Sequence, residues 1–139
     1  MATHLTCTAE SDAAFLLPHI KKSDKILDVG CGPGTITTNL AKYTSDGHIT
    51  GIDISEQIIL KAKHLAGDAG IPTEGAGAVT FKRADGLSSL PFPDDTFDSV
   101  FASQVFGHFT SQDQALRALV ETRRVLKPGG IVATRDGAA

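Results

Sequence analysis

Glycine occupies alternate positions in one short stretch of the sequence, at Gly30, Gly32 and Gly34. The stretch follows the apolar run KILDV, typical of a buried strand, and precedes residues with helical spacing. Residues without a Cβ let the chain reverse sharply and let a ligand approach the backbone closely. The start of a helix behind such a loop offers N–H groups and a positive dipole end. The loop is therefore a candidate site for an anionic group of a ligand.

The spacing of this loop differs from that of the common phosphate-binding motifs. The dinucleotide fingerprint has a third glycine where this sequence has Thr35, and no Gly-Lys-Ser/Thr follows as in a P-loop. Pro33 also removes one N–H donor from the loop. A carboxylate needs fewer donors than a phosphate, so the pattern favours a carboxylate-bearing ligand.

Three acidic residues stand at or near the carboxyl ends of predicted strands. Asp28 lies in an otherwise apolar run, an unfavourable place for a carboxylate unless a cation meets it. Asp53 follows 19 residues after Gly34, where an acid can accept hydrogen bonds from a ribose diol, and Ile54 beside it can cover a flat base. Asp85 comes just after the third predicted strand. Because parallel strands end at the same edge of a sheet, we expect these acids to converge on one crevice.

The elements that must position these residues alternate along the chain. Apolar runs rich in β-branched residues are separated by segments of helical spacing, which is typical of an α/β domain with a parallel sheet. The predicted strands are Lys25–Val29, His48–Ile54, Val79–Arg83, Phe97–Ser103 and Ile131–Thr134. The predicted helices are Thr8–Leu17, Thr35–Tyr43, one capped by Ser55 and one capped by Ser111.

The helix capped by Ser111 has a mixed pattern of apolar and charged residues. We expect Leu116, Leu119 and Val120 to face the sheet, with charged side chains such as Glu121 and Arg124 in water. The turn 127–130 (KPGG) should end the helix before the last strand begins.

Composition and charge are those of an ordinary globular domain. The 139 residues suit a single domain, residues 1–139, with an N-terminal helical segment, residues 1–23, and a core, residues 24–135. The net charge of -3 gives no positive field for nucleic acid or an anionic membrane. No window has the apolar length of a membrane span and no signal-peptide pattern opens the sequence, so we expect a cytoplasmic protein. Cys7 and Cys31 lack the spacing of a zinc site, and we expect reduced thiols and no metal.

S-adenosylmethionine offers the amine, carboxylate, ribose and adenine that these residues would meet, and it carries no phosphate. Four segments occur in the order and at the spacing of a known family: ILDVGCGPG (26–34), GIDIS (51–55), ADGLSSLPFPDDTFD (84–98) and RVLKPGG (124–130). With these segments the sequence resembles the class I, Rossmann-like, S-adenosylmethionine-dependent methyltransferases, within them the ubiquinone/menaquinone-biosynthesis-like group of small-molecule enzymes. The resemblance implies a doubly wound, mostly parallel sheet with the strand order 3-2-1-4-5.

The resemblance also assigns a part of the cofactor to the glycine loop. It implies that the loop from Gly30 through Cys31 and Gly32 to Gly34 lines the methionyl part. Asp28 would help to hold the amino group. In this assignment Cys31 needs only to be small.

The resemblance assigns the adenosyl part of the cofactor to residues at the ends of the next two predicted strands. Asp53 would bind the ribose hydroxyls, and Ile54 would pack on the adenine. Asp85 and the backbone at Gly86 would read the edge of the adenine.

Ser103 and Gln104, at the end of the fourth predicted strand, would border the methyl donor and the acceptor. Attack of a nucleophilic O, N, S or C on a sulfonium methyl depends mostly on alignment, so such a site can work without an acid or base. If one is needed, His108 is the candidate because imidazole titrates near neutral pH. A surface or helix-capping role for His108 is the favoured alternative.

The sequence departs from the family after the fifth predicted strand. Complete members add a C-terminal antiparallel hairpin there, and this sequence lacks one. An open edge with Ile131 and Val132 exposed invites pairing, so we expect a homodimer or another partner to cover it.

Two functions stay open. One is methyl transfer to a small-molecule acceptor, with a partner or residues 1–18 completing the acceptor site. The other is a module that binds the cofactor or a small molecule without methylating, as a scaffold, a partner subunit or a catalyst of different chemistry.

Overall fold

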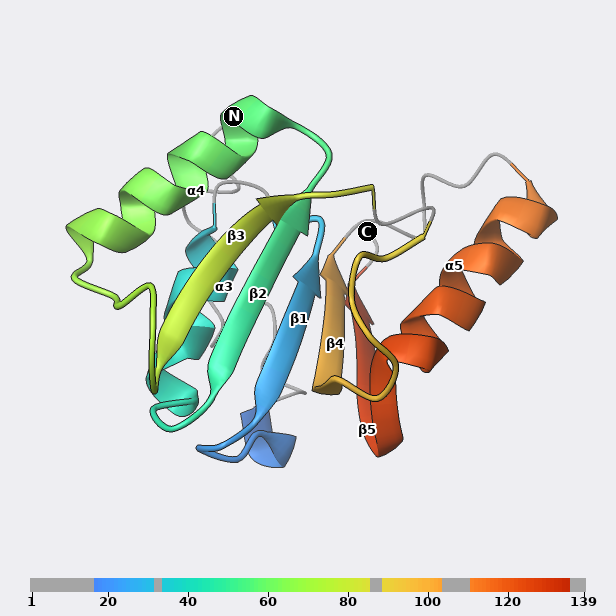
Figure 1. Cartoon of the computed structure of the whole chain (residues 1–139), viewed down its shortest axis with the longest axis horizontal. Coiled ribbons are helices and arrows are strands. Elements are labelled where there is room, and N and C mark those ends of the chain that lie inside the picture. Colours follow the sequence, from blue (N-terminus) through green and yellow to red (C-terminus); the bar gives the residue numbers. More distant parts are fainter. Residues whose placement is uncertain (1–16, 32–33, 86–88, 104–110, 136–139) are drawn as a thin grey trace.

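A five-stranded parallel sheet forms the centre of the molecule (Figure 1). The computed structural model describes residues 17–31, 34–85, 89–103 and 111–135. The strands lie in the order β3-β2-β1-β4-β5, and every neighbouring pair is parallel. Their bounds are β1 (Lys25–Val29), β2 (His48–Asp53), β3 (Ala78–Arg83), β4 (Phe97–Ser103) and β5 (Leu126–Arg135). The predicted fold class and strand order are confirmed.

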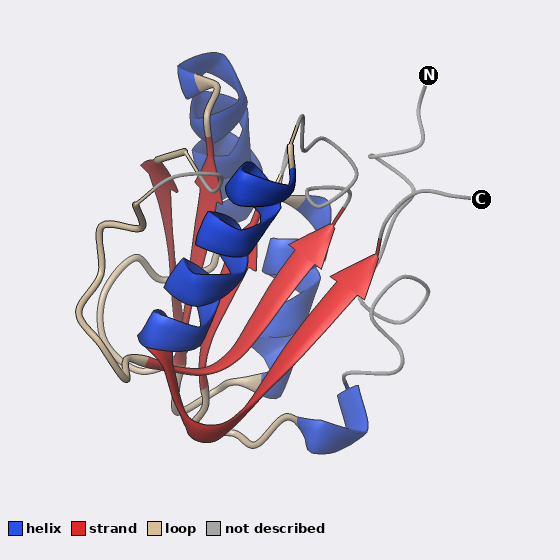
Figure 2. Ribbon diagram, turned by 90° about the vertical axis from the view of Figure 1, so that its right-hand side faces the viewer, coloured by secondary structure: helices blue, strands red, loops and turns tan. Residues whose placement is uncertain are grey.

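Helices cover both faces of this sheet (Figures 1 and 2). One face carries α3 (Thr35–Leu40), which continues into the short 3-10 helix η2 (Ala41–Tyr43), and α4 (Glu56–Asp68). The other face carries α5 (Gln112–Val125). A second 3-10 turn, η1 (Leu17–His19), precedes β1, and the helix predicted before it lies almost wholly outside the described residues.

The core consists of two apolar layers, one on each face of the sheet. Alternation along β1 sends Ile26 into the layer under α3 and α4, and Leu27 into the layer under α5. Both side chains are wholly buried, as is Phe101 of β4. Because helices cover both faces of the sheet at β1, side chains on both of its faces are buried, which explains its apolar run.

The two longer helices begin at the predicted caps. The Ser55 hydroxyl accepts a hydrogen bond from the Ile58 backbone N–H at 3.3 Å, and the Ser111 hydroxyl accepts one from the Gln114 N–H at 3.1 Å. Each bond satisfies one of the N–H groups that a helix start leaves unpaired. The first of these caps matters for the site because it fixes the turn that follows Asp53.

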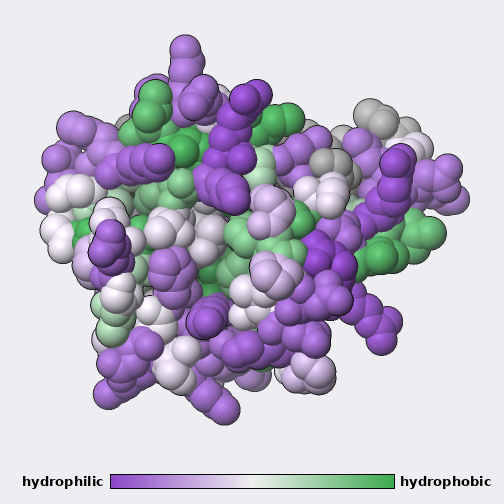
Figure 3. Space-filling model, viewed as in Figure 1, coloured by the Kyte–Doolittle hydropathy of each residue, from purple (hydrophilic) through white to green (hydrophobic). Residues whose placement is uncertain are grey.

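The predicted inner face of α5 is wrong. Leu116, Leu119 and Val120 are 61%, 52% and 57% exposed, and Figure 3 shows apolar surface on the outer side of this helix. The buried residues are the smaller set Ala118, Thr122 and Val125, at i, i+4 and i+7. Thr122 tolerates burial because its hydroxyl donates to the Ala118 carbonyl at 2.8 Å. In the sequence, the large apolar side chains suggested Leu116, Leu119 and Val120 as the inner face of α5. In the structure, the smaller residues pack closely on the sheet instead.

The last strand begins earlier than predicted. Leu126 pairs with Phe97, and the next paired residues are Ile131 and Ser99, so residues 127–130 form a bulge within β5 rather than a turn before it. Val132 at this edge is 44% exposed, as expected. Ile131 is partly buried and packs against the core under α3 and α4, so its predicted exposure is wrong.

Candidate functional site

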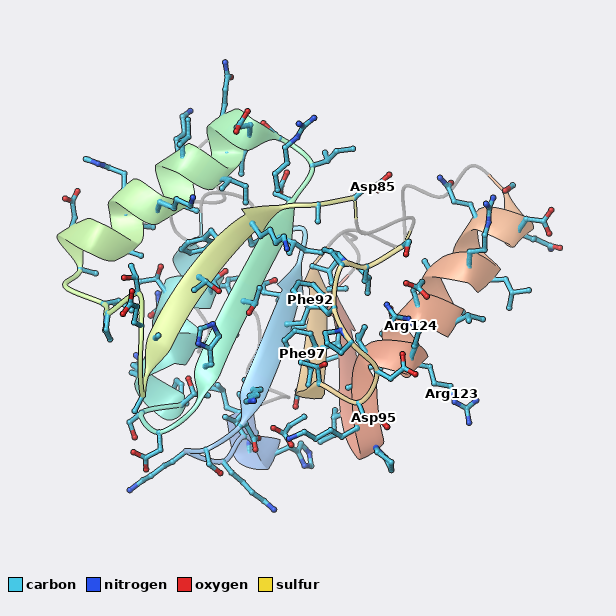
Figure 4. All side chains as sticks on the ribbon, in the orientation of Figure 1. Asp85, Phe92, Asp95, Phe97, Arg123 and Arg124 are labelled. Carbon is cyan, nitrogen blue, oxygen red and sulfur yellow. The ribbon has the colours of Figure 1, made fainter. Side chains whose placement is uncertain are left out.

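The carboxyl ends of β1, β2 and β3 meet at one edge of the sheet. Asp28 is paired in register with Gly51, and Asp53, the last residue of β2, is paired with Arg83, the last residue of β3. Asp85 follows two residues after β3 and lies at this same edge in Figure 4. The edge is the usual ligand-binding side of an open parallel sheet.

The glycine loop folds back onto the end of β2. The backbone N–H groups of Gly30 and Cys31 both donate to the Ile52 carbonyl at 2.9 Å, and the Gly34 N–H donates to the Cys31 carbonyl at 3.1 Å. These three N–H groups are therefore used within the protein. Gly32 lies outside the described residues.

Close packing gives a structural reason for glycine at two positions near the loop. Gly34 has a φ of 86°, and an added Cβ would lie 3.0 Å from the Ala62 Cβ and 3.1 Å from the Phe81 ring. At Gly51 an added Cβ would lie 2.9 Å from Phe81 and 3.1 Å from the Cys31 Cβ. The loop, α4 and β3 thus meet with no room for a methyl group.

Asp28 is the buried member of the three acids. We expected it to open onto the crevice, but alternation along β1 turns it toward α3, with only 1% of the residue exposed. Thr37 of α3 donates from Oγ1 to Asp28 Oδ2 at 2.5 Å. The other carboxyl oxygen, Oδ1, has no hydrogen-bond partner among the described residues. A buried acceptor in this state is suited to a donor from a ligand.

Burial also changes the acidity of this carboxyl group. It raises the pKa of Asp28 from 3.8 to about 7, the hydrogen bond from Thr37 opposes the rise, and the Asp53 carboxylate adds to it. The Asp28 carboxyl group therefore titrates near neutral pH. A cationic group near Oδ1 would favour the ionised form.

Asp53 and Ile54 form the end of β2 at the same edge. The Asp53 Oδ1 accepts the Ser55 backbone N–H at 3.1 Å, and the Asp53 carbonyl accepts the Ala84 N–H at 2.9 Å. Ile54 is 62% exposed, and its carbonyl accepts the Arg83 Nε at 3.0 Å. A half-buried carboxylate thus stands next to an exposed apolar side chain, an arrangement that suits a sugar joined to a flat base.

Cys31 of the glycine loop is buried and lies close enough to Asp28 and Asp53 to feel their charges. Burial raises the pKa of its thiol well above the usual range, and the charges of Asp28 and Asp53 raise it further. The thiol therefore stays protonated at neutral pH and is unsuited to act as a nucleophile.

Several predicted site residues cannot be placed. Ser103 ends β4, and its side chain is not described. Gly86, Gln104 and His108 lie outside the described residues, as does Gly32.

Sequence reasoning missed the role of Glu121 and Arg124, which it assigned to solvent. Arg124 donates to the Leu90 carbonyl at 2.9 Å and to the Phe92 carbonyl at 2.7 Å, while Glu121 accepts the Leu90 N–H at 2.8 Å. Their own hydrogen bonds join the two side chains at 2.9 and 3.0 Å and lower the pKa of Glu121. The pair fastens Leu90 and Phe92, in the connection before β4, to α5. Figure 4 labels Arg124 on α5 and Phe92 in this connection. A charged pair three residues apart on a helix gave no signal of this contact.

Thr37 is the other residue that the sequence reasoning missed. It lies nine positions after Asp28, within a run of helix residues in which three of the first four are threonine. A threonine on the buried side of a helix that packs beside a buried acid was the available signal.

Two general features of the described part of the chain bear on function. It contains no helix with the length and apolar character needed to cross a membrane. It also contains no group of three or more His, Cys, Asp or Glu residues arranged to hold a metal ion.

Comparison with known proteins agrees with this geometry. The chain matches the methyltransferase domain family over residues 26–130. It is 55% identical over 134 residues to "Probable methyltransferase ltbC" of Aspergillus luteorubrus, covering 96% of this chain and 47% of that protein. It is 35% identical to the ubiquinone/menaquinone biosynthesis C-methyltransferase of Vibrio parahaemolyticus, covering 79% of this chain and 40% of that protein. The chain thus spans about half the length of the curated relatives it matches.

Solved structures give the same result. An S-adenosylmethionine-dependent methyltransferase of Methanosarcina mazei superposes with a TM-score of 0.70 at 31% identity, covering 81% of this chain and 52% of that one. The [4+2]-cyclase SpnF superposes with a TM-score of 0.70 at 30% identity, covering 93% of this chain and 46% of that one. The family match covers all five strands in part or in full, and the observed fold agrees with it. The chain therefore belongs to the methyltransferase domain family.

Proposed function

We propose that this chain binds S-adenosylmethionine at the carboxyl edge of its sheet and takes part in methyl transfer to a small-molecule acceptor. The observation that carries the proposal is the buried Asp28 carboxyl, whose Oδ1 lacks a partner among the described residues. Family membership and the S-adenosylmethionine-dependent structural relative support the same cofactor. Because the chain spans only about half of its relatives, the activity itself is part of the proposal.

The residues present fit this cofactor. Asp28 offers an acceptor for the amino group, and the described donors of the glycine loop are used internally, which suits a ligand without phosphate. Asp53 would hold the ribose hydroxyls, with exposed Ile54 beside it for the adenine. Asp85, with Gly86, would contact the adenine edge, and the Glu121–Arg124 pair holds part of the connection that follows it.

When bound, the cofactor supplies a sulfonium methyl group that a nucleophilic O, N, S or C can attack in line. The contribution of the chain is to hold and orient this group, which can supply a large part of the rate acceleration. Ser103 and Gln104 would lie beside the methyl group and the acceptor. His108 is the candidate base if the acceptor needs one, and methyl transfer without a base is the alternative.

A second function has a specific observation in its favour. The [4+2]-cyclase SpnF shares this fold at 30% identity, so a protein with this fold can carry out a different reaction. In that case the present chain would bind the cofactor or another small molecule, and no methyl group would be transferred. The two functions share the strand-end acids and differ in whether a methyl group leaves the cofactor.

We also propose that a homodimer or another partner covers the β5 edge, and that the protein acts in the cytoplasm. Val132 on this edge strand is 44% exposed, and unpaired strand edges favour association. Sedimentation at micromolar concentration should give a dimer or larger species. A monomer whose β5 amides exchange freely with solvent would contradict the proposal.

The proposed activity is tested with a labelled methyl group. The chain is incubated with methyl-labelled S-adenosylmethionine and a small-molecule extract, and mass spectrometry searches for labelled products. Asp46 is an exposed acid just before β2, at the end of the strand opposite Asp53. Label transfer that disappears in Asp53→Ala and persists in Asp46→Ala supports methyl transfer. Binding without any transfer supports the second function.

The affinity of Asp53→Ala provides an independent measurement. Losing the partner of the ribose hydroxyls should weaken cofactor binding by about 1–3 kcal/mol, while Asp46→Ala keeps the affinity of the parent chain. Equal affinity of both variants would show that Asp53 does not bind the ribose.

A further inference from the structure

Two adjacent threonines in α3 differ in what their hydroxyl groups contact. Thr37 is wholly buried, and its Oγ1 donates to Asp28 Oδ2 at 2.5 Å. Thr38 is half-buried, and its Oγ1 is enclosed without a hydrogen-bond partner among the described residues. The chain therefore contains one hydroxyl that serves the buried acid and a neighbouring hydroxyl that does not.

The bond from Thr37 fixes the Asp28 carboxyl group. Thr37 is β-branched and lies in a helix, so few rotamers are open to it and its hydroxyl is held in place. With Oδ2 occupied by this bond, Oδ1 is the carboxyl oxygen that lacks a hydrogen-bond partner among the described residues. A hydroxyl donor also stabilises a carboxylate more than a neutral acid, because bonds to charged groups are stronger.

We propose that Thr37 is a positioning residue for the cofactor. Its hydroxyl orients the Asp28 carboxyl and favours the ionised form, so that Oδ1 can accept a hydrogen bond from the ammonium group of S-adenosylmethionine. The inference rests on the proposed function, since it takes the cofactor as the ligand of this edge. Thr37 itself is buried behind Asp28 and acts only through it.

The surroundings of Asp28 make this role sensitive to pH. The titratable groups that bear on its carboxyl are Cys31 of the glycine loop and Asp53 of β2. The α3 sequence TITTNL has no titratable side chain, and the β4 residue paired with Asp28 is Phe101. With a pKa of about 7, Asp28 is partly protonated before the ligand arrives. Binding of an ammonium group should therefore release a proton from Asp28, and affinity should rise between pH 6 and 8.

The test compares Thr37→Val with Thr38→Val by calorimetry with S-adenosylmethionine between pH 6 and 8. Both changes replace a buried hydroxyl with a methyl group. A lost hydrogen bond to a charged group corresponds to about one to two pKa units, so Thr37→Val should bind about tenfold to a hundredfold more weakly at pH 7. Its affinity profile should move to higher pH, whereas Thr38→Val should match the parent chain. Thr37→Ser should restore both the affinity and the profile.

A second readout does not need the cofactor. A carbon NMR titration of Asp28 in the ligand-free chain should show a higher pKa in Thr37→Val than in Thr38→Val. If Thr37→Val does not fold, Thr37→Ala is used in both measurements. Equal affinities and pH profiles for the Thr37 and Thr38 variants would overturn the positioning role. Failure of the parent chain to bind S-adenosylmethionine would overturn the proposed function as well.

Discussion

Replacing Asp28 by asparagine should stabilise the ligand-free protein at high pH while weakening cofactor binding. The folded state raises the pKa of Asp28 from 3.8 to about 7, so between these values the folded chain holds a proton that the unfolded chain has lost. Stability therefore falls as pH rises through this window. At 1.36 kcal/mol per pKa unit, the full loss is about 4 kcal/mol above pH 7. Asparagine keeps the shape and an acceptor for Thr37, and it has no charge to bury.

The assay is urea unfolding of the parent chain and Asp28→Asn at several values between pH 4 and pH 8. The quantity that matters is the difference in unfolding free energy at each pH, because the other titrating groups are common to both chains and cancel. The difference should be near zero at pH 4 and should grow in favour of Asp28→Asn to about 4 kcal/mol at pH 8. Asp46→Asn, which changes an exposed acid, serves as the matched control and should show no such trend.

Two results would contradict the expected effect of Asp28 on stability. A stability difference that does not change with pH would mean that Asp28 does not titrate in this window in the folded protein. A variant less stable than the parent at pH 8 would mean that the ionised carboxyl has partners that the structure does not show. The same variant should also bind S-adenosylmethionine more weakly, since a neutral amide attracts an ammonium group less than a carboxylate does.

The remaining predictions concern the scaffold around the site. In Gly47→Ala the new Cβ would lie 2.0 Å from the Asp24 carbonyl oxygen, so urea unfolding should show a loss of about 3 kcal/mol or more. Gly67→Ala is the matched control: nothing lies within 4 Å of its added Cβ in α4, and stability should rise by about 0.5–1 kcal/mol. Arg124→Met should lower the unfolding midpoint and speed hydrogen exchange at the Leu90 amide. Unchanged exchange there would show that Arg124 does not hold the connection.

Much of the fold follows from local sequence signals. A strand that is buried on both faces needs apolar side chains throughout, so the run KILDV predicts β1. Ser55 and Ser111 predict helix starts because serine hydroxyl groups accept the unpaired N–H groups there. The inner face of α5 could not be predicted in the same way. Residue size favoured Leu116 as a core residue, but the sheet accepts the smaller stripe that includes Ala118.

The site was predictable in its residue types more than in its contacts. The positions of Asp53 and Asp85 follow from parallel strands that end at one edge. The burial of Asp28 follows from alternation along β1, but its bond to Thr37 depends on how α3 packs against that strand. Contacts such as those of Arg124 with the connection before β4 join residues more than 30 positions apart, which no local pattern encodes.

Binding of S-adenosylmethionine at the carboxyl edge of the sheet is best measured by calorimetric titration of this chain with the cofactor and with its demethylated product. We expect one binding site per chain for the cofactor, with an affinity that rises from pH 6 to pH 8. If the chain is folded by circular dichroism and gives no heat with either compound, S-adenosylmethionine is not its ligand.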